Sequence, residues 1–318
     1  MDRRQFLAAT AATAAGMGAR HSAAAQITGA VPARKFYSNL ALGLLGPFHA
    51  TFPQTMDLAV RYGFGGVDPN ARYLASRSDA ALEELTGRMH AQHLGFGTMN
   101  LPVDFRGGES SFSDSLTQLP AAIAPLQRAG ATRLITWLVP TSNELTYLQN
   151  FRQTAERLRQ SALVLDAHGL RLGLEYVAPR TSWTRGRYPF LHTMAELREL
   201  IAAIGCPNVG ICLDSWHWFN AHDTVQQILD LHASDVVAVH LNDAPAGLTF
   251  DTYRDGQREL PAATGVIPIA SFLDALRQIG YEGPVSAEPN NAALRQMPMD
   301  AALAATAAAV KQAFGEMS

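Results

Sequence analysis

The chain has 318 residues, of which 47% are hydrophobic and 17% charged, and its formal net charge is −3. This composition is typical of a globular protein with ample material for a core, and it excludes a disordered chain. A mildly acidic chain without a run of lysines or arginines has no basic surface for nucleic acid or an anionic membrane. We therefore expect a small-molecule ligand and no nucleic-acid partner.

The chain begins MDRRQFLAATAATAAGMGARHSAAAQ. Two adjacent arginines, Arg3 and Arg4, precede a weakly apolar, alanine-rich stretch, which is typical of a twin-arginine export signal cleaved near Ala25. We predict a signal peptide over residues 1–25, a linker over residues 26–35 and a periplasmic or extracellular protein. An ordinary helix and an uncleaved leader that acts as an anchor are the alternatives. No later segment reaches the roughly 18 apolar residues of a membrane span.

After this leader, short segments rich in β-forming residues alternate with segments of helical periodicity. Apolar residues recur at steps of three and four between the short segments, and glycines follow as stop signals. No Gly-x-Gly-x-x-Gly motif follows the first short segment, which disfavours a dinucleotide-binding fold. We predict a single α/β domain, a (β/α)8 TIM barrel over residues 36–318. Its eight strands are expected at residues 37–43, 65–68, 95–100, 132–138, 171–177, 208–214, 236–240 and 284–288.

Polar residues end the last four predicted strands: LGLE ends on Glu175, GICLD on Asp214, VVAVH on His240 and PVSAE on Glu288. Because the carboxyl ends of parallel strands lie at one rim of a barrel, these four side chains are expected to meet. Any one of them can instead cap a helix or face solvent. Several carboxylates beside apolar strands, however, repel one another unless a cation or a shared proton compensates.

Three carboxylates and one imidazole form a donor set without a thiolate. Such a set favours Mn²⁺, Mg²⁺ or Co²⁺, with Zn²⁺ as an alternative. We predict one divalent metal ion held by these four side chains. An ion of this kind polarises a carbonyl group and acidifies the adjacent C–H bond. The two cysteines, Cys206 and Cys212, are interpreted as structural.

With these motifs the chain resembles the xylose isomerase-like TIM barrels, a family that includes sugar isomerases and epimerases, inosose dehydratase and endonuclease IV. The resemblance spans about residues 36–316 and rests on GLEYVAP, GICLDSWHW, VVAVHLNDAPAG and GPVSAEP in the family order. It implies that the four strand-end residues are metal ligands. It further implies that Glu175 and Glu288 move protons on either face of a ketose.

The same resemblance suggests two substrate-binding residues. His217 matches the histidine of the family's D-x-x-H motif, which contacts a substrate oxygen, although a hydrogen bond within its loop is the alternative. Arg258, in RELPAATGVIPI, resembles an arginine that holds a substrate hydroxyl or enediolate oxygen. A long insertion separates Arg258 from His240, which weakens this assignment.

Three further groups of residues are weaker candidates. Aromatic side chains could wall the site or pack in the core: Trp216, Trp218 and Phe219. Two polar residues lie near the first strands: His49, in the loop after the first predicted strand, and Asp68, which ends the second. Three arginines could bind a carboxylate or phosphate, but a solvated loop is the more usual place for them: Arg180, Arg185 and Arg187.

The predicted function is that of a metal-dependent sugar isomerase or epimerase that acts on an unphosphorylated sugar or oxo-sugar through an enediolate. Export disfavours sugar phosphates, because these are mainly intracellular. The first alternative is a lyase or dehydratase that eliminates from an oxo-glycoside or keto-inositol. A phosphodiesterase is opposed by the missing histidines after His240, and a non-enzymatic carbohydrate-binding protein has no need of both Glu175 and Glu288. A homo-oligomer is compatible with the sequence.

Overall fold

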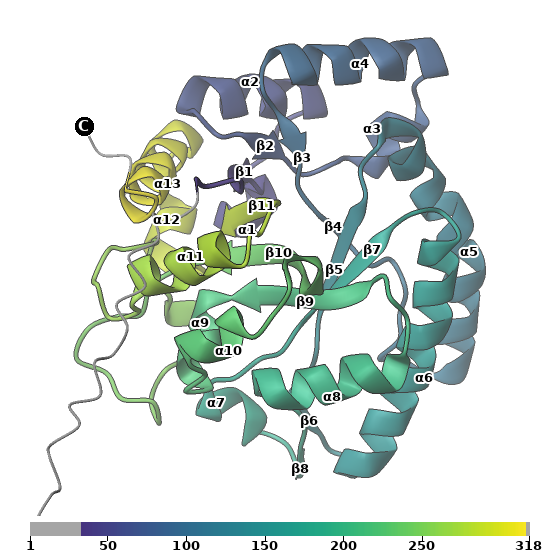
Figure 1. Ribbon diagram of the computed structural model, residues 1–318, viewed down its shortest axis with the longest axis vertical. Helices are drawn as coiled ribbons and strands as arrows, with labels where there is room; N and C mark the ends of the chain where they lie inside the picture. Colours follow the sequence, from purple (N-terminus) through teal and green to yellow (C-terminus); the bar gives the residue numbers. More distant parts are fainter. Residues whose placement is uncertain (1–32, 316–318) are drawn as a thin grey trace, which may run out of the picture. The chain divides into compact units, whose positions relative to one another are not determined.

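The computed structural model describes residues 33–315, and Figure 1 shows its strands and helices. Nine strands form one sheet in the order β3-β2-β1-β11-β10-β9-β7-β5-β4, and every neighbouring pair is parallel. Their bounds are β1 (Tyr37–Leu40), β2 (Gly66–Val67), β3 (Gly95–Phe96), β4 (Met99–Asn100), β5 (Arg133–Trp137), β7 (Arg171–Glu175), β9 (Val209–Asp214), β10 (Val236–Leu241) and β11 (Pro284–Ala287).

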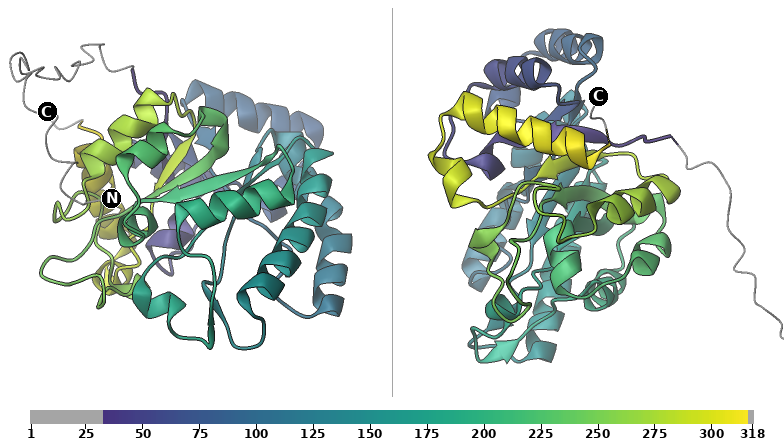
Figure 2. Two further views of the ribbon diagram at one scale, coloured as in Figure 1. Left: turned by 60° about the horizontal axis from the view of Figure 1, so that its bottom comes forward. Right: turned by 90° about the vertical axis from the view of Figure 1, so that its left-hand side faces the viewer.

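Helices connect most of these strands and lie on the outside of the sheet (Figure 2). Their buried faces follow the helical period: in α6 the buried residues Ala155, Leu158, Ala162 and Leu165 recur at steps of three and four. The longer helices are α2 (Phe52–Tyr62), α4 (Asp79–Ala91), α5 (Glu109–Ala129), α6 (Tyr147–Asp166), α8 (Met194–Ile204), α11 (Ile269–Gln278) and α13 (Met299–Ala313).

Short elements occupy the connections between strands and helices. An antiparallel pair, β6 with β8, lies outside the main sheet. The bounds of the short elements are α1 (Leu42–Leu45), α3 (Ala71–Ala75), β6 (Thr141–Ser142), α7 (Arg180–Trp183), β8 (Tyr188–Pro189), α9 (Ser215–Asn220), α10 (Val225–Leu229), η1 (Ala233–Asp235), η2 (Asp255–Gln257) and α12 (Ala292–Gln296).

The two ends of the sheet lie on one segment of chain. β3 pairs with β2 and β4 pairs with β5, and only Gly97 and Thr98 separate β3 from β4. The predicted third strand, residues 95–100, is therefore interrupted, and each half pairs on one side. This arrangement is TIM-barrel-like, with eight strand positions along the described chain.

Gly97 and Thr98 form the seam between β3 and β4. Glycine is needed at position 97 because its backbone passes close to polar side chains. A Cβ atom at Gly97 would clash with Asp68 and Asn39. We expect Gly97→Ala to lower the free energy of unfolding by about 2 kcal/mol, as overpacking does. Urea denaturation tests this, with Gly87→Ala as the matched control, because a Cβ atom at Gly87 in α4 meets open space. The control is expected to be neutral or stabilising, and equal effects of the two substitutions would contradict the steric explanation.

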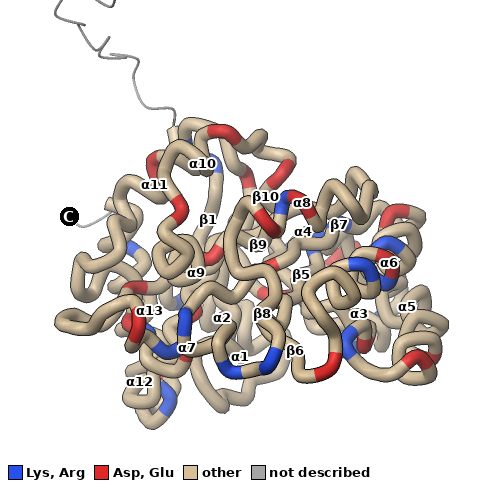
Figure 3. The backbone as a smooth tube through the Cα atoms, turned by 90° about the horizontal axis from the view of Figure 1, so that it is seen from below, with Lys and Arg blue, Asp and Glu red and all other residues tan. Residues whose placement is uncertain are grey.

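Several sequence expectations are corrected or fall outside the described residues. The first strand was expected over residues 37–43 but ends at Leu40, because α1 begins at Leu42. The predicted signal peptide, residues 1–25, and most of the predicted linker lie outside the described part, so export stays a prediction. Within residues 33–315, no helix is long and apolar enough to cross a membrane. Lysine and arginine are interspersed with aspartate and glutamate along the described backbone (Figure 3).

Candidate active site

Four neighbouring strands deliver the four strand-end side chains to one place. Glu175 is the last residue of β7, Asp214 is the last residue of β9, His240 lies near the end of β10, and Glu288 directly follows β11. The register places His240 opposite Asp214 on one side and opposite Ser286 on the other. The expectation that these strand ends meet is therefore confirmed.

The donor atoms of this cluster are close enough to share one cation. One ligand atom from each of the four residues lies within 4.8 Å of the others. His240 Nδ1 lies 3.1 Å from Glu175 Oε1, 3.1 Å from Glu288 Oε2 and 4.0 Å from Asp214 Oδ2. The other ring nitrogen, Nε2, is buried and has no hydrogen-bond partner among the described residues. The Nδ1 side of His240 therefore faces the carboxylates, and the set fits a divalent metal ion.

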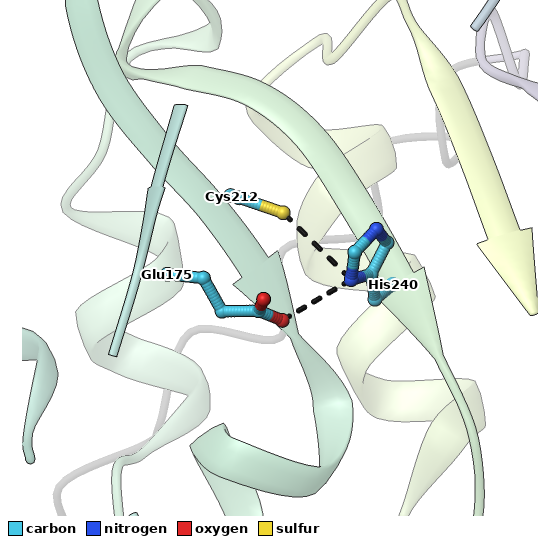
Figure 4. Close-up of side chains that lie close together, drawn as sticks. All are labelled: Glu175, Cys212 and His240. Atoms are coloured by element: carbon cyan, nitrogen blue, oxygen red, sulfur yellow. Dashed lines mark hydrogen bonds and ion pairs between the residues drawn. The ribbon is translucent and has the colours of Figure 1, made fainter. Parts of the chain in front are cut away.

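Cys212 lies beside this cluster, closer than the sequence indicated. Figure 4 shows its side chain with those of Glu175 and His240, and its Sγ is 3.9 Å from His240 Nδ1. Burial raises the pKa of the Cys212 thiol to about 12, which favours a neutral thiol near pH 7. Cys206 is also buried, with its Sγ 3.8 Å from the carbonyl oxygen of Ile204.

Burial and neighbouring charges act differently on the two glutamates. Burial raises the pKa of Glu175, and Glu288 adds to the increase while His240 opposes it. Burial also acts to raise the pKa of Glu288, but His240 and Arg258 outweigh burial and hold this pKa well below its usual range. Two carboxyl groups in one site whose pKa values are driven apart are suited to different proton-transfer roles.

Arg258 lies directly against the donor cluster. Its Nη1 donates to Asp214 Oδ2 at 3.0 Å and to Glu288 Oε2 at 2.9 Å, and its Nη2 lies 3.2 Å from His217 Nε2. Burial alone would lower the pKa of Arg258, but the surrounding carboxylates outweigh it and raise this pKa. The long insertion before Arg258 is anchored by Asp243, which exchanges two backbone hydrogen bonds with Glu259.

His217 and Asp255 complete the surroundings of Arg258. The Nδ1 atom of His217 lies 3.3 Å from the Ala178 backbone N–H, so both of its ring nitrogens face donors. A neutral imidazole accepts at only one nitrogen, so one of these two contacts is not a hydrogen bond. Asp255, which sequence reasoning missed, accepts from Arg258 and from Trp216 Nε1. Asp255 lies within the insertion and not at the end of a strand, so no sequence pattern identified it.

A cavity of about 490 Å³ opens over the cluster. Its lining includes Glu175, His217, Arg258 and Glu288, which places the proposed catalytic and substrate-binding residues in one space. Its volume is within the range of small-molecule sites. Trp137, the last residue of β5, also lines the cavity. Further lining residues come from connections between strands and helices: Asn143, Ser182, Arg185, Asp255 and Asn290.

The three aromatic residues that could either wall the site or pack in the core do not line the cavity. Trp216 is buried edge-on to Tyr253, Trp218 packs against Phe272, and Phe219 packs against Phe250. These contacts confirm the alternative of core packing. The cavity is instead lined by Trp137, whose side chain sequence reasoning missed. Trp137 ends β5 and pairs in register with Glu175, so its position at a strand end was the available signal.

Asp68 and His49 line a different cavity, which does not include the four-residue cluster. Asp68 Oδ1 accepts hydrogen bonds from Asn39 Nδ2 at 2.8 Å and from the Thr98 backbone N–H at 3.0 Å. These bonds tie the ends of β1 and β2 to the seam between β3 and β4. Both residues were weak candidates for the site, and Asp68 has a structural role at the seam.

We expect stability to depend on pH through Asp68. Burial raises its pKa from 3.8 to about 6, although the two hydrogen bonds oppose the increase. Because the folded state holds this proton more tightly than the unfolded state, the contribution of Asp68 to stability falls as the pH rises from about 4 to about 6. Asp68→Asn should be more stable than the wild type at pH 7, by up to about 3 kcal/mol, and not at pH 4. Urea denaturation at the two pH values measures this, and a pH-independent difference would contradict it.

A TIM-barrel-like sheet with a carboxylate and histidine cluster at its strand ends defines a class of protein, and comparison with known proteins identifies the family. The model of the xylose isomerase-like TIM barrel family matches residues 56–312, so the chain belongs to this family. This confirms the resemblance indicated by the four motifs.

Individual relatives cover different shares of the chain. An inosose isomerase of Bacillus velezensis is 21% identical over 252 residues, which are 76% of this chain and 84% of the relative. A 3-dehydroshikimate dehydratase of Pseudomonas aeruginosa is 31% identical over 146 residues, which are 45% of this chain and only 22% of that longer protein.

Two solved structures share the fold. A xylose isomerase domain protein from Alicyclobacillus acidocaldarius is 30% identical, with a TM-score of 0.74, and the match covers 88% of this chain and 99% of that one. The IOLI protein, solved with a bound zinc atom, is 16% identical, with a TM-score of 0.70, over 89% of this chain and 99% of that one. The second similarity concerns the fold alone.

Proposed function

We propose that this protein is a divalent-metal-dependent sugar isomerase or epimerase that acts on an unphosphorylated sugar or oxo-sugar by proton transfer through an enediolate. One observation carries the proposal: carboxylate oxygens of Glu175 and Glu288 both lie 3.1 Å from His240 Nδ1, and both glutamates line a cavity large enough for a sugar. The similarity to inosose isomerase supports an isomerase of a small polyhydroxylated substrate.

The metal ligands in this proposal are Glu175, Asp214, His240 and Glu288. Manganese, magnesium and cobalt ions suit the three carboxylates, and zinc, the ion bound in the IOLI structure, is the alternative. The bound ion would polarise the substrate carbonyl and so acidify the neighbouring C–H bond.

Side chains of the protein would then transfer the substrate proton and hold the substrate oxygens. Glu175 and Glu288 come from strands on opposite sides of His240, and two carboxyl groups can take a proton from one carbon and return it elsewhere. Return to the opposite face gives an epimer, and return to the neighbouring carbon gives an aldose from a ketose. Arg258 and His217 line the cavity beside Glu288 and would hold substrate oxygens.

The test is proton exchange with solvent. Metal-reconstituted protein is incubated with a panel of ketoses and oxo-sugars in D2O, and deuterium incorporation is followed by NMR. We expect exchange at the carbon next to the carbonyl group of at least one sugar. An absence of exchange across the panel, together with an absence of divalent metal binding, would refute the proposal.

A second candidate function is elimination by a lyase or dehydratase. The similarity to 3-dehydroshikimate dehydratase favours it, and the same four donors and two carboxyl groups suit the initial removal of a proton. Product mass separates the two functions, because an isomerase conserves the mass of its substrate whereas a dehydratase releases water.

A further inference from the structure

The three arginines that follow β7 differ in their surroundings. Arg180 Nη1 pairs with Asp251 Oδ1 at 3.0 Å, and Arg187 packs over the ring of Tyr188. Arg185 instead lines the cavity above the glutamates. Within residues 33–315 the side chain of Arg185 makes no hydrogen bond or ion pair. One of the three arginines therefore offers a free guanidinium group to the cavity.

The backbone that carries Arg185 is fixed on both sides. Before it, in α7, Thr181 Oγ1 donates to the Tyr253 carbonyl oxygen at 2.6 Å and Ser182 Oγ donates to Asp255 Oδ2 at 3.3 Å. After it, β8 pairs with β6, and a side chain at Gly186 would clash with Thr141. The backbone around Arg185 is therefore held in place at the edge of the cavity.

Among the charged residues that line the cavity, Arg185 has no ion-pair partner. The other guanidinium group, that of Arg258, is already bonded to Asp214, Asp255 and Glu288. Arginine presents two parallel N–H groups that match the two oxygens of a carboxylate. A single unpaired arginine balances one negative charge, which suits a carboxylate better than a doubly charged phosphate.

We infer that the substrate is a sugar acid, a ketose whose end remote from the carbonyl group is a carboxylate bound by Arg185. This inference rests on the proposed function and narrows it to one substrate class. Glu175 and Glu288 would act at the carbonyl end of the substrate, while Arg185 selects the acidic end.

The experiment compares ligands that differ only at that end. D-fructuronate and D-fructose are ketoses with a carboxylate or a CH2OH group at the terminal carbon, and the corresponding fructose phosphate is the third probe. Affinities for the metal-loaded full-length chain are measured by calorimetry at low salt. We expect the wild type to bind fructuronate about tenfold more tightly than fructose, as one charge-assisted hydrogen-bonded pair allows.

Variants assign this preference to Arg185. Arg185→Ala should abolish the tenfold ratio, and Arg185→Lys should retain part of it. Arg187→Ala, in the same loop, should keep the ratio, which would show that loss of an arginine from this loop does not by itself abolish it. The inference is overturned if fructuronate has no advantage, if its advantage survives in Arg185→Ala, or if the phosphate binds more tightly than the carboxylate.

The binding ratio is separate from proton exchange. If none of these ketoses or the wider panel exchanges a proton, the proposed function fails, and the ratio still decides whether Arg185 binds a carboxylate. If a neutral ketose exchanges and fructuronate has no binding advantage, the proposed function stands and the sugar-acid inference fails.

Discussion

Replacing Glu288 by glutamine is expected to lower the rate of substrate proton exchange by about 10³-fold, which is the usual contribution of a positioned acid or base. Glutamine keeps the shape of the side chain and an oxygen that can accept from Arg258, but it cannot take up a proton. Deuterium incorporation followed by NMR measures the rate. A Glu288→Gln variant with full activity would contradict the proton-transfer role.

Metal content must be measured with the same samples, because Glu288 also belongs to the donor cluster. If the variant binds metal with lower affinity, the rate is compared at saturating metal. Glu282→Gln is the matched control, since Glu282 is exposed, pairs with Lys35 and lies at the opposite end of β11 from Glu288. The control is expected to exchange at the wild-type rate.

The second large effect is expected at Asp214. Its side chain is fully buried, accepts from the backbone N–H groups of Trp216 and His217, and pairs with Arg258. Asp214→Ala removes the N-cap of α9 and leaves Arg258 buried with less compensating charge. We expect a loss of about 3–5 kcal/mol in the free energy of unfolding, as for a broken buried ion pair.

Urea denaturation in EDTA measures this loss without a contribution from bound metal. Asp214→Asn serves as the comparison, because asparagine keeps the capping oxygen while removing the charge, and it should cost less stability than alanine. Both variants should bind divalent metal much more weakly in calorimetry. Wild-type metal affinity in Asp214→Ala would contradict the assignment of Asp214 as a ligand.

The strand ends were the predictable part of the fold and the site. Glu175, Asp214, His240 and Glu288 each follow an apolar run, and parallel strands must bring such ends to one rim. Trp137 also ends a strand, but it is not a charged or metal-binding residue, so only the register that places it beside Glu175 shows that it belongs to the site. The aromatic residues after Asp214 seemed available to the site, but the α9 turn directs Trp216 and Trp218 into the core.

In the long insertion, the family resemblance indicated Arg258, but sequence reasoning missed Asp255 and could not show how the insertion folds. Arg258 reaches the cluster because Asp243 and Glu259 pair across the insertion, and Asp243 also accepts from the backbone N–H groups of Thr264, Gly265 and Ile267. A buried carboxylate that organises a loop has no periodic pattern. Likewise, only the contacts of Arg180 and Arg187 show which arginine remains free for the cavity.

The interrupted strand at residues 95–100 has a consequence for the motions of the native state. Each half pairs with only one neighbour and over only two residues, whereas β9 and β10 are paired on both sides. Local opening begins where the fewest backbone hydrogen bonds must break. The ring of strands should therefore open at Gly97 and Thr98, on a side of the sheet away from β9 and β10, so that the donor cluster can stay assembled while the seam fluctuates.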